Sequence, residues 1–445
     1  KRKLIYYRFY YKMSDCMEVL FVSDGNGRQT ANCFNPNVGT TLMTYNGSGG
    51  AKRTLSVIGN DYLISADLNK PILNVWSLNS QECSHNLRMV ISGKPSCLTV
   101  SSDGYYCIAG IDEKIYIWQI SCGALLNTLS KHYQKVNKIV FTDDSSHFLT
   151  AGDDGLVCMW KLGDVIVKQS GDIFKQNLSQ ASPVYTFSHH SLPITDIFVG
   201  SGNLKSRLFT VSSDQTCKIY CLGTGELLLS IVFSYVLTAV TVNELETELF
   251  VGTYNGKIEV FHLEPYPRGL ECHTSNETNL EETLIGHTKT VTCLSSSLDG
   301  VTLASGSEDE KVFLWNIPSK QLIRSFEMKG PITNLFFHFA SSNIFTDSFK
   351  PQLVINKFEK TSTQSDKSLV ANVWVHQDLK PLSNRLELSD KRKSEPQTDN
   401  QLKTFNDEFV SLKNEISKLK EANKQLYQFA MKEIIQNPYS IGMKK

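Results

Sequence analysis

An all-β propeller, in which four-stranded blades form a ring, is the fold class that this sequence predicts, and two observations predict it. Six segments share a short apolar strand, a turn and a second strand that bears an aromatic; GIDEKIYIW, GDDGLVCMW and GSEDEKVFLW are among them. Their aromatics are Trp76, Trp118, Trp160, Tyr220, Phe261 and Trp315, at spacings of 42, 42, 60, 41 and 54 residues. A period near 42 with two insertions matches repeats of roughly 40 to 45 residues that each build one blade.

Two of these segments also carry a recurring polar set, whose members are His287, Ser305, Asp309 and Trp315 in one and His132, Thr150, Asp154 and Trp160 in the other. In both sets the His, the hydroxyl and the Asp precede the Trp by 28, 10 and 6 residues. These four groups can satisfy one another by hydrogen bonds inside a blade, so we expect structural tetrads. A catalytic Ser-His-Asp interpretation is weak, because repetition in two blades argues for packing. The pattern is typical of a WD-repeat β-propeller.

Composition excludes several classes of protein. The chain has 445 residues, 41% of them hydrophobic, so it can bury a large core, and its net charge of zero does not favour a broad basic face for nucleic acid. The sequence contains no run of 18 apolar residues, so it predicts no membrane-spanning helix. The eleven cysteines include no CxxC pair, and Cys217 and Cys221 lack further zinc ligands. We expect no cofactor, no metal and a reducing compartment.

The chain begins with a basic, aromatic stretch, KRKLIYYRFYYK. It is either a basic targeting tail or translated upstream sequence before a start at Met13 or Met17. We therefore exclude residues 1–16 from the fold as a non-native or disordered tail, and we place the propeller at residues 17–358.

The number of blades depends on the two ends of the propeller. Phe34 lies 42 residues before Trp76, and Phe358 in LVINKF lies 43 residues after Trp315. These positions give either eight blades or a seven-bladed ring whose terminal segments share the closing blade. Sharing removes free sheet edges, and the terminal segments are less regular than full repeats, so the sequence favours seven.

Two insertions fall at about residues 161–187 and 264–282, and both are rich in polar and turn residues. We expect rim loops there, which serve either as binding loops or as tolerated surface length. Residues 359–400 are a polar linker. Its Lys391–Lys393 triplet is either a nuclear-import signal or part of a solvated linker.

The C-terminal segment, residues 401–436, shows a heptad pattern of apolar residues, followed by a tail at 437–445. The seam consists of Leu402, Phe405, Phe409, Leu412, Ile416, Leu419, Asn423 and Leu426. An Ile at position a with Leu at position d, and a single Asn at position a, favour a two-stranded parallel coiled coil. Glu408 and Glu415 would then face Lys413 and Lys420 of the partner. The pattern favours a parallel homodimer, although the same seam could pack on the propeller or on a helix of another protein.

Motifs for enzyme chemistry are few. GNGRQT and GSGG lack the forms of phosphate-binding loops. His189 and His190 are either a metal pair or a blade-leading His with its neighbour, and the second is favoured because no third ligand is nearby. We therefore expect no enzyme.

Several segments are more specific than the repeat consensus, notably KHYQKV, SHHSLPITDIF, GTGELLLS and KGPITN. In this order, and followed by a coiled coil, they resemble the WD repeat-containing protein 18 family, whose fungal members are the WD-repeat subunits of the Rix complex. The resemblance covers roughly residues 17–358 and the terminal helix.

This resemblance implies a non-catalytic scaffold in a Rix/PELP-type ribosome-assembly complex of the nucleus, in nucleolus and nucleoplasm. The implied partners are a PELP/Rix-type α-solenoid protein, a testis-expressed/Ipi-type HEAT-like protein, the large-subunit pre-ribosome and, indirectly, a midasin-type ATPase. The implied step is rRNA processing at the second internal transcribed spacer. The alternative is a substrate receptor or adaptor of another complex such as a ubiquitin ligase, for which the sequence offers no adaptor motif.

Overall fold

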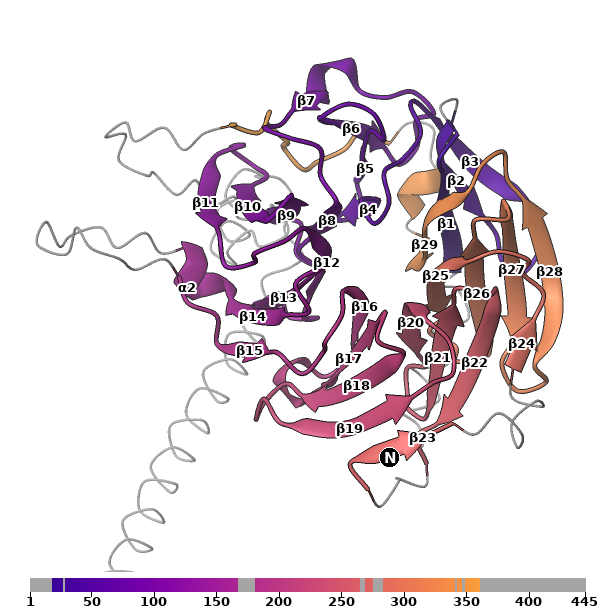
Figure 1. Cartoon of the computed structure of the whole chain (residues 1–445). Helices are drawn as coiled ribbons and strands as arrows, with labels where there is room; N and C mark the ends of the chain where they lie inside the picture. Colours follow the sequence, from indigo (N-terminus) through magenta and orange to yellow (C-terminus); the bar gives the residue numbers. More distant parts are fainter. Residues whose placement is uncertain are drawn as a thin grey trace, which may run out of the picture. The chain divides into compact units, whose positions relative to one another are not determined.

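The computed structural model describes residues 18–26, 29–166, 181–264, 269–274, 283–340, 342–345 and 349–360. The chain divides into units of residues 1–364 and 365–445, and all described residues lie in the first. In that unit seven sheets surround a common centre (Figure 1), which confirms the predicted seven-bladed β-propeller. The predicted coiled coil, its seam and most of the linker lie outside the described residues.

We letter the blades A to G around the ring and give their strands from the centre outward. Blade A has β29 (Ile332–Phe339), β1 (Glu18–Asp24), β2 (Gln29–Phe34) and β3 (Thr41–Asn46); blade B has β4 (Ser56–Ile58), β5 (Tyr62–Ala66), β6 (Ile72–Ser77) and β7 (Met89–Val90). Blade C has β8 (Cys97–Val100), β9 (Tyr106–Ile111), β10 (Lys114–Gln119) and β11 (Leu125–Leu129); blade D has β12 (Val136–Phe141), β13 (His147–Gly152), β14 (Val157–Lys161) and β15 (Tyr185–Phe187).

The remaining blades follow the same order. Blade E has β16 (Ile194–Val199), β17 (Arg207–Ser212), β18 (Thr216–Cys221), β19 (Leu227–Val232) and β23 (Glu271–His273); blade F has β20 (Leu237–Val242), β21 (Glu248–Thr253), β22 (Lys257–His262) and β24 (Thr283–Ile285). Blade G has β25 (Val291–Ser296), β26 (Thr302–Ser307), β27 (Lys311–Asn316) and β28 (Gln321–Glu327). The short helices α2 (Leu162–Ile166), η1 (His85–Leu87), η2 (Asn203–Lys205) and η4 (Ser342–Phe345) lie in connections.

Blade A closes the ring with strands from both ends of the propeller. The inner strand β29 pairs antiparallel with β1 along its length, from Glu18 opposite Phe339 to Asp24 opposite Ile332. Phe34 lies in β2, the third strand, as Trp76 lies in the third strand of blade B. Blade A therefore combines the N-terminal strands with β29, which gives seven blades and pairs the inner edge of β1.

The assignment of Phe358 to the closing blade is wrong. The C-terminal contribution to that blade is β29, and residues 349–360 form no strand. Phe358 instead stacks on Trp118 of blade C, with ring centroids 5.2 Å apart and planes inclined by 8°. Spacing placed Phe358 in the closing blade, but its ring finds its packing partner in a blade formed much earlier in the chain.

The prediction of rim loops for both insertions needs a correction. Both insertions join the third and fourth strands of a blade, in D and in F. The first contributes α2 and β15 to the structure, and the second contributes β23, which pairs parallel with β19 of the preceding blade. An edge strand offers unpaired backbone groups, and β23 satisfies those of β19.

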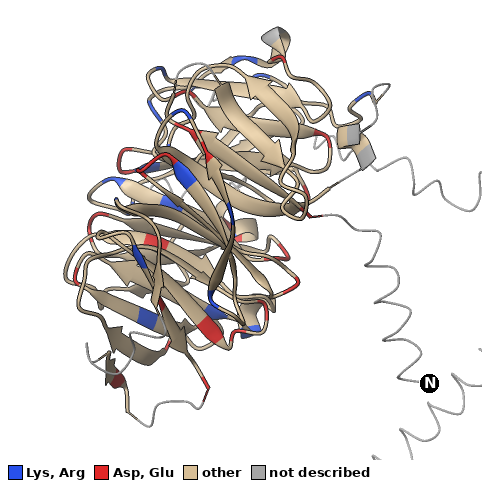
Figure 2. Ribbon diagram, turned by 90° about the vertical axis from the view of Figure 1, so that its right-hand side faces the viewer, with Lys and Arg blue, Asp and Glu red and all other residues tan. Residues whose placement is uncertain are grey.

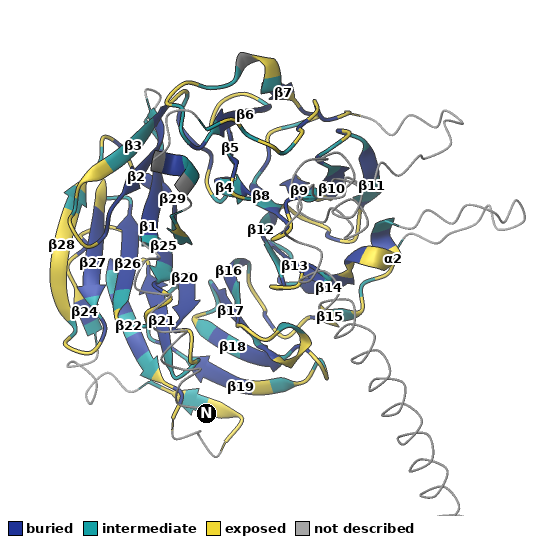
Figure 3. Cartoon of the chain, turned by 180° about the vertical axis from the view of Figure 1, so that it is seen from behind, coloured by how far each residue is buried: buried dark blue, intermediate teal, exposed yellow. Residues whose placement is uncertain are grey.

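Seven apolar clusters fill the junctions between neighbouring blades, so each blade is sandwiched between two others. Figure 3 shows the buried residues along the inner and middle strands and more exposed residues on outer strands and loops. Trp76, Trp118 and Trp160 are among the largest fully buried side chains. The aromatic that recurs in the sequence thus packs in the junctions between neighbouring blades.

The inner strands are also linked by side-chain hydrogen bonds at a repeated β-bulge. Asn137, Thr195, Thr238 and Thr292 each occupy the bulged position near the start of an inner strand. Each donates to the carbonyl oxygen of the first residue of the next inner strand, at 2.9, 3.0, 2.6 and 2.8 Å. A bulge re-aims a side chain, and here it directs the donors from blade to blade around the centre.

Candidate functional site

In blade G, the structure brings together the four residues that the sequence groups with Trp315. His287 Nδ1 lies 3.0 Å from Asp309 Oδ2, and His287 Nε2 lies 2.8 Å from Ser305 Oγ. Trp315 Nε1 donates to the same Ser305 Oγ at 2.9 Å. A neutral imidazole that carries its proton on Nδ1 satisfies every group, because the Ser hydroxyl accepts from the indole and donates to Nε2.

Blade D repeats this geometry. His132 lies 3.0 Å from Asp154 and 2.8 Å from Thr150 Oγ1, which accepts from Trp160 Nε1 at 3.1 Å. The Thr150 and Ser305 residues are both 0% exposed. A nucleophile needs access to its substrate, so these sets act by tying the second and third strands to the loop that precedes the inner strand.

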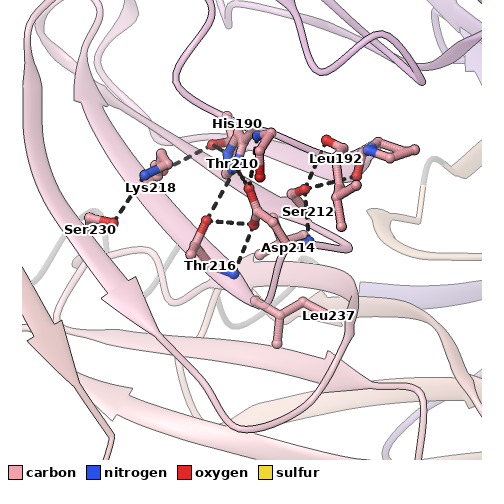
Figure 4. A network of polar contacts seen from close by, with 12 residues as sticks. His190, Leu192, Thr210, Ser212, Asp214, Thr216, Lys218, Ser230 and Leu237 are labelled. Atoms are coloured by element: carbon pink, nitrogen blue, oxygen red, sulfur yellow. Dashed lines mark hydrogen bonds and ion pairs between the residues drawn. The ribbon is translucent and has the colours of Figure 1, made fainter.

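A third set, in blade E, was not predicted from the sequence (Figure 4). His190 lies 3.0 Å from Asp214 Oδ2 and 2.7 Å from Thr210 Oγ1. Tyr220 occupies the sequence position of the tryptophan, but its buried hydroxyl has no hydrogen-bond partner among the described residues. Thr210 and Asp214 precede Tyr220 by the usual 10 and 6 residues, but His190 precedes it by 30 rather than 28. Two of the three offsets were therefore a usable signal. Of the two interpretations of His189 and His190, the geometry fits the blade-leading histidine.

The other repeated aromatics have different partners. Trp76 Nε1 donates to the carbonyl oxygen of Asn46 at 2.9 Å, and Trp118 Nε1 donates to that of Glu359 at 2.8 Å. Phe261 has no polar group to satisfy and packs partly buried against the cluster between blades E and F. Blades without a tetrad thus still satisfy the indole of their tryptophan.

The tetrads predict that the fold loses stability in acid. Burial lowers the pKa of His287; for Asp309 burial acts to raise the pKa, but the Thr288 amide and His287 outweigh it and the pKa lies below its ordinary value. The unfolded chain then binds more protons than the folded chain below about pH 6.5, so the unfolding free energy should fall as pH falls. We expect the thermal midpoint to drop from pH 7 to pH 5, and to drop less in His287→Gln. Equal drops in both proteins would contradict this.

A segment that we call the strap, residues 349–360, crosses blades B and C. Asp61 Oδ2 accepts from the amides of Gln352 and Leu353 at 2.7 and 2.8 Å, and the Glu359 amide donates to the carbonyl oxygen of Gly123 at 2.9 Å. Gly123 has φ +73° and lies so close to Lys357 that a Cβ would meet its carbonyl oxygen at 2.1 Å. The strap therefore requires glycine at this turn.

Loss of the strap's aromatic should weaken blades B and C, which lack a tetrad. Phe358 is 5% exposed against Trp118, so Phe358→Ala should cost about 3 kcal/mol. Val354→Ala, on the same segment but at a side chain 44% exposed, is the control and should change stability little. Chemical unfolding followed by circular dichroism measures both, and similar midpoints for the two variants would show that the strap does not stabilise the ring.

The two faces of the ring have cavities with different linings. On the linker face, each inner strand begins after the linker from the preceding blade, and a cavity of about 260 Å³ there is lined by Lys52, Arg53, Lys135 and Glu308 among others. On the opposite face, a cavity of about 140 Å³ between blades G and A is lined by Pro36, Leu298, Phe337 and Phe339 among others. Leu298 and Phe339 are 41% and 43% exposed.

Among the described residues, no group of three or more His, Cys, Asp or Glu could hold a metal ion, and the ten cysteines they include are free thiols. Burial raises the pKa of most of these thiols, for example that of Cys97 to about 11. No helix within the described ranges is long and apolar enough to span a membrane.

Comparisons with known proteins agree with this fold. The WD domain, G-beta repeat, matches residues 123–161, 181–221 and 278–316. The chain is 38% identical over 322 residues to "WD repeat-containing protein 18" of Homo sapiens, covering 72% of this chain and 73% of that protein. It is 33% identical over 432 residues to the Danio rerio protein of the same name, covering 94% and 98%. It is also 26% identical over 331 residues to "Pre-rRNA-processing protein pro-1" of Caenorhabditis elegans, covering 72% and 61%.

Proposed function

The chain belongs to the WD repeat-containing protein 18 family, and from this premise we propose that it is a scaffold subunit in nuclear ribosome biogenesis. The observation that carries the proposal is the similarity to relatives named for pre-rRNA processing over 72% of this chain, together with closer similarity to the family itself. A rigid ring with buried tetrads and several faces suits a protein that holds partners together.

The finer proposal is that the chain works in a Rix/PELP-type complex on precursors of the large ribosomal subunit. There it would join the PELP/Rix-type α-solenoid and the testis-expressed/Ipi-type protein, support processing at the second internal transcribed spacer and meet a midasin-type ATPase indirectly. In this proposal the chain is not an enzyme and acts in the nucleolus and nucleoplasm.

The cavity between blades G and A, on the face opposite the linkers, supports the proposal that a protein partner binds there. Its exposed Leu298 and Phe339 lie beside Glu18 and Asp299, so an apolar centre has a charged margin. Protein interfaces commonly combine such a centre with a polar rim. We expect Leu298→Glu to weaken capture of the solenoid partner.

The second part of the proposal is that residues 401–436 join two copies of the chain in a parallel dimer. It rests on the heptad pattern alone. Leu412→Asp with Leu419→Asp places two carboxylates in the seam, so light scattering should give the mass of a monomer. Ser411→Asp with Ser417→Asp introduces the same charges at heptad positions outside the seam and should leave the dimer intact. A wild-type protein that is itself monomeric would refute the homodimer.

Purification of the tagged chain from nuclear extract at mild salt tests the function, with bound proteins and RNAs identified together. The scaffold proposal expects the solenoid and HEAT-like partners with precursors of large-subunit rRNA. Recovery of ubiquitin-ligase adaptors without pre-ribosomal RNA would support the alternative function and refute the proposal.

A further inference from the structure

The loops at the two ends of the inner strands differ in charge, although the whole chain is neutral. The seven linkers that lead into the inner strands, residues 47–55, 91–96, 130–135, 188–193, 233–236, 286–290 and 328–331, contain no Asp or Glu. Five of the seven contain Lys or Arg. The turns that leave the inner strands of blades B to G, on the opposite face, contain acids in every blade except E, whose turn has Lys205.

Figure 2 gives an edge-on view in which acidic residues lie on several loops along the right-hand side, whereas the loops at the left carry both basic and acidic residues. Linkers approach the centre of the ring because each ends at an inner strand. Of their basic residues, Lys52, Arg53 and Lys135 line the cavity at the mouth of the centre, where their fields add.

The mouth itself contains cations that lack an ion pair. Within the described residues, Lys52 pairs with Glu308 at 3.2 Å, whereas no ion pair involves Arg53 or Lys135, which line the same cavity. Asp196, which shares a second cavity of about 200 Å³ with Arg53, pairs with Lys138 at 3.5 Å and accepts from two backbone amides. Arg53 and Lys135 therefore have no carboxylate partner among the described residues and can interact with an anion.

Arg53 is held at the centre by its backbone. Its φ of 57° is the left-handed conformation, which costs a non-glycine residue about 1 kcal/mol or more. Its guanidinium nitrogens lie 3.4 Å from the carbonyl oxygens of Asn137 and Thr238, on blades D and F. These contacts are at the long limit of hydrogen bonding, so its donors are only weakly engaged.

The surroundings restrict what the mouth can bind. The hairpins between second and third strands, on the same face, carry Asp112, Glu113, Asp153, Glu308 and Glu310. Asp153 accepts from Asn137 Nδ2 at 2.6 Å, and Glu308 lines the cavity itself. This acidic surround repels an extended polyanion that lies across the face. A cavity of about 260 Å³ is also smaller than the roughly 300–1,000 Å³ of pockets for organic ligands. We propose that the mouth of the linker face binds a compact phosphate anion between Arg53 and Lys135.

Calorimetric titration with inorganic tripolyphosphate tests this on the full chain. We expect binding that weakens as salt is raised, because the charges are partly exposed. Arg53→Gln with Lys135→Gln should weaken binding more than tenfold. Lys205→Gln removes one positive charge from the opposite face, as Lys135→Gln does from the mouth, and should leave binding unchanged. Circular dichroism establishes that each variant is folded, and exposed Lys135→Gln alone gives a second test if Arg53→Gln unfolds the ring.

A second arm asks where the phosphate comes from, with a single-stranded oligouridine that has hydroxyl ends. RNA binding that tripolyphosphate displaces, and that the double variant loses, would support the site and identify nucleic-acid phosphate as its ligand. Tripolyphosphate binding without RNA binding would support the site and identify a free phosphate compound. No tripolyphosphate binding to the wild type, or binding that the double variant retains, would overturn the proposal.

Discussion

Replacing Trp315 by Ala should lower the free energy of unfolding by about 3–5 kcal/mol, the range for a fully buried large aromatic. Trp315 is 3% exposed, belongs to the cluster between blades F and G and donates to Ser305. The substitution therefore leaves a cavity and also removes the donor that completes the tetrad. Urea unfolding followed by circular dichroism measures the loss without depending on tryptophan fluorescence.

Trp315→Phe separates these two contributions. It keeps most of the apolar volume and removes the indole N–H, so it should cost about 1–2 kcal/mol. Ser305→Ala in the Phe background should then cost less than in the wild type, because the hydrogen bond is already gone. If the Phe variant were as unstable as the Ala variant, the apolar volume that Phe retains would contribute nothing to stability. That result would contradict a packing contribution from Trp315 beside its hydrogen bond.

Asn334→Leu should cost about 3 kcal/mol or more, because it breaks the junction between blades A and B. The Asn334 side chain makes buried hydrogen bonds there: Oδ1 accepts from the Thr54 amide at 2.8 Å, and Nδ2 donates to the Ala51 carbonyl at 2.8 Å and to Ser23 Oγ at 2.7 Å. Asn334 is 5% exposed. Each buried group left without a partner costs about 1–3 kcal/mol.

Asn343→Leu is the matched control for this prediction. Within the described ranges, the Asn343 side chain donates one hydrogen bond, to the carbonyl oxygen of Asn60 at 2.8 Å in an exposed connection. Water can replace that bond, so the variant should lose less than about 1 kcal/mol. Equal unfolding midpoints for the two variants would mean that the junction of blades A and B does not depend on Asn334.

Much of the candidate site was predictable because its signals are local. The aromatic period and the offsets within the tetrads of His132 and His287 lie inside one repeat, where strand length and turn type fix the spacing. The hydrogen-bonded set of His190 was not predicted, because the turn between β16 and β17 is two residues longer than in blades D and G and Tyr220 replaces the usual tryptophan. The offsets of Thr210 and Asp214 were unchanged, since β17 and β18 form a hairpin with the same register.

Local sequence patterns gave wrong predictions for segments that pack against distant parts of the chain. Phe358 has the correct period for a blade aromatic, yet it stacks on Trp118, some 240 residues earlier in the chain. The second insertion looked like a loop because of its polar composition, yet β23 pairs with a strand of another blade. Neither outcome follows from local propensity, because both depend on which surface lies within reach after the ring has formed.

The sequence by itself determined the propeller, the repeat aromatics and two of the tetrads, because hydrophobic period and hydrogen-bond complementarity act over tens of residues. Only the tertiary structure decided that β29 closes the ring with β1, that the strap covers blades B and C, and that basic linkers gather on one face. The physical reason is that closure pairs residues more than 300 positions apart. Such pairings are chosen by the geometry of seven packed blades, which no single repeat contains.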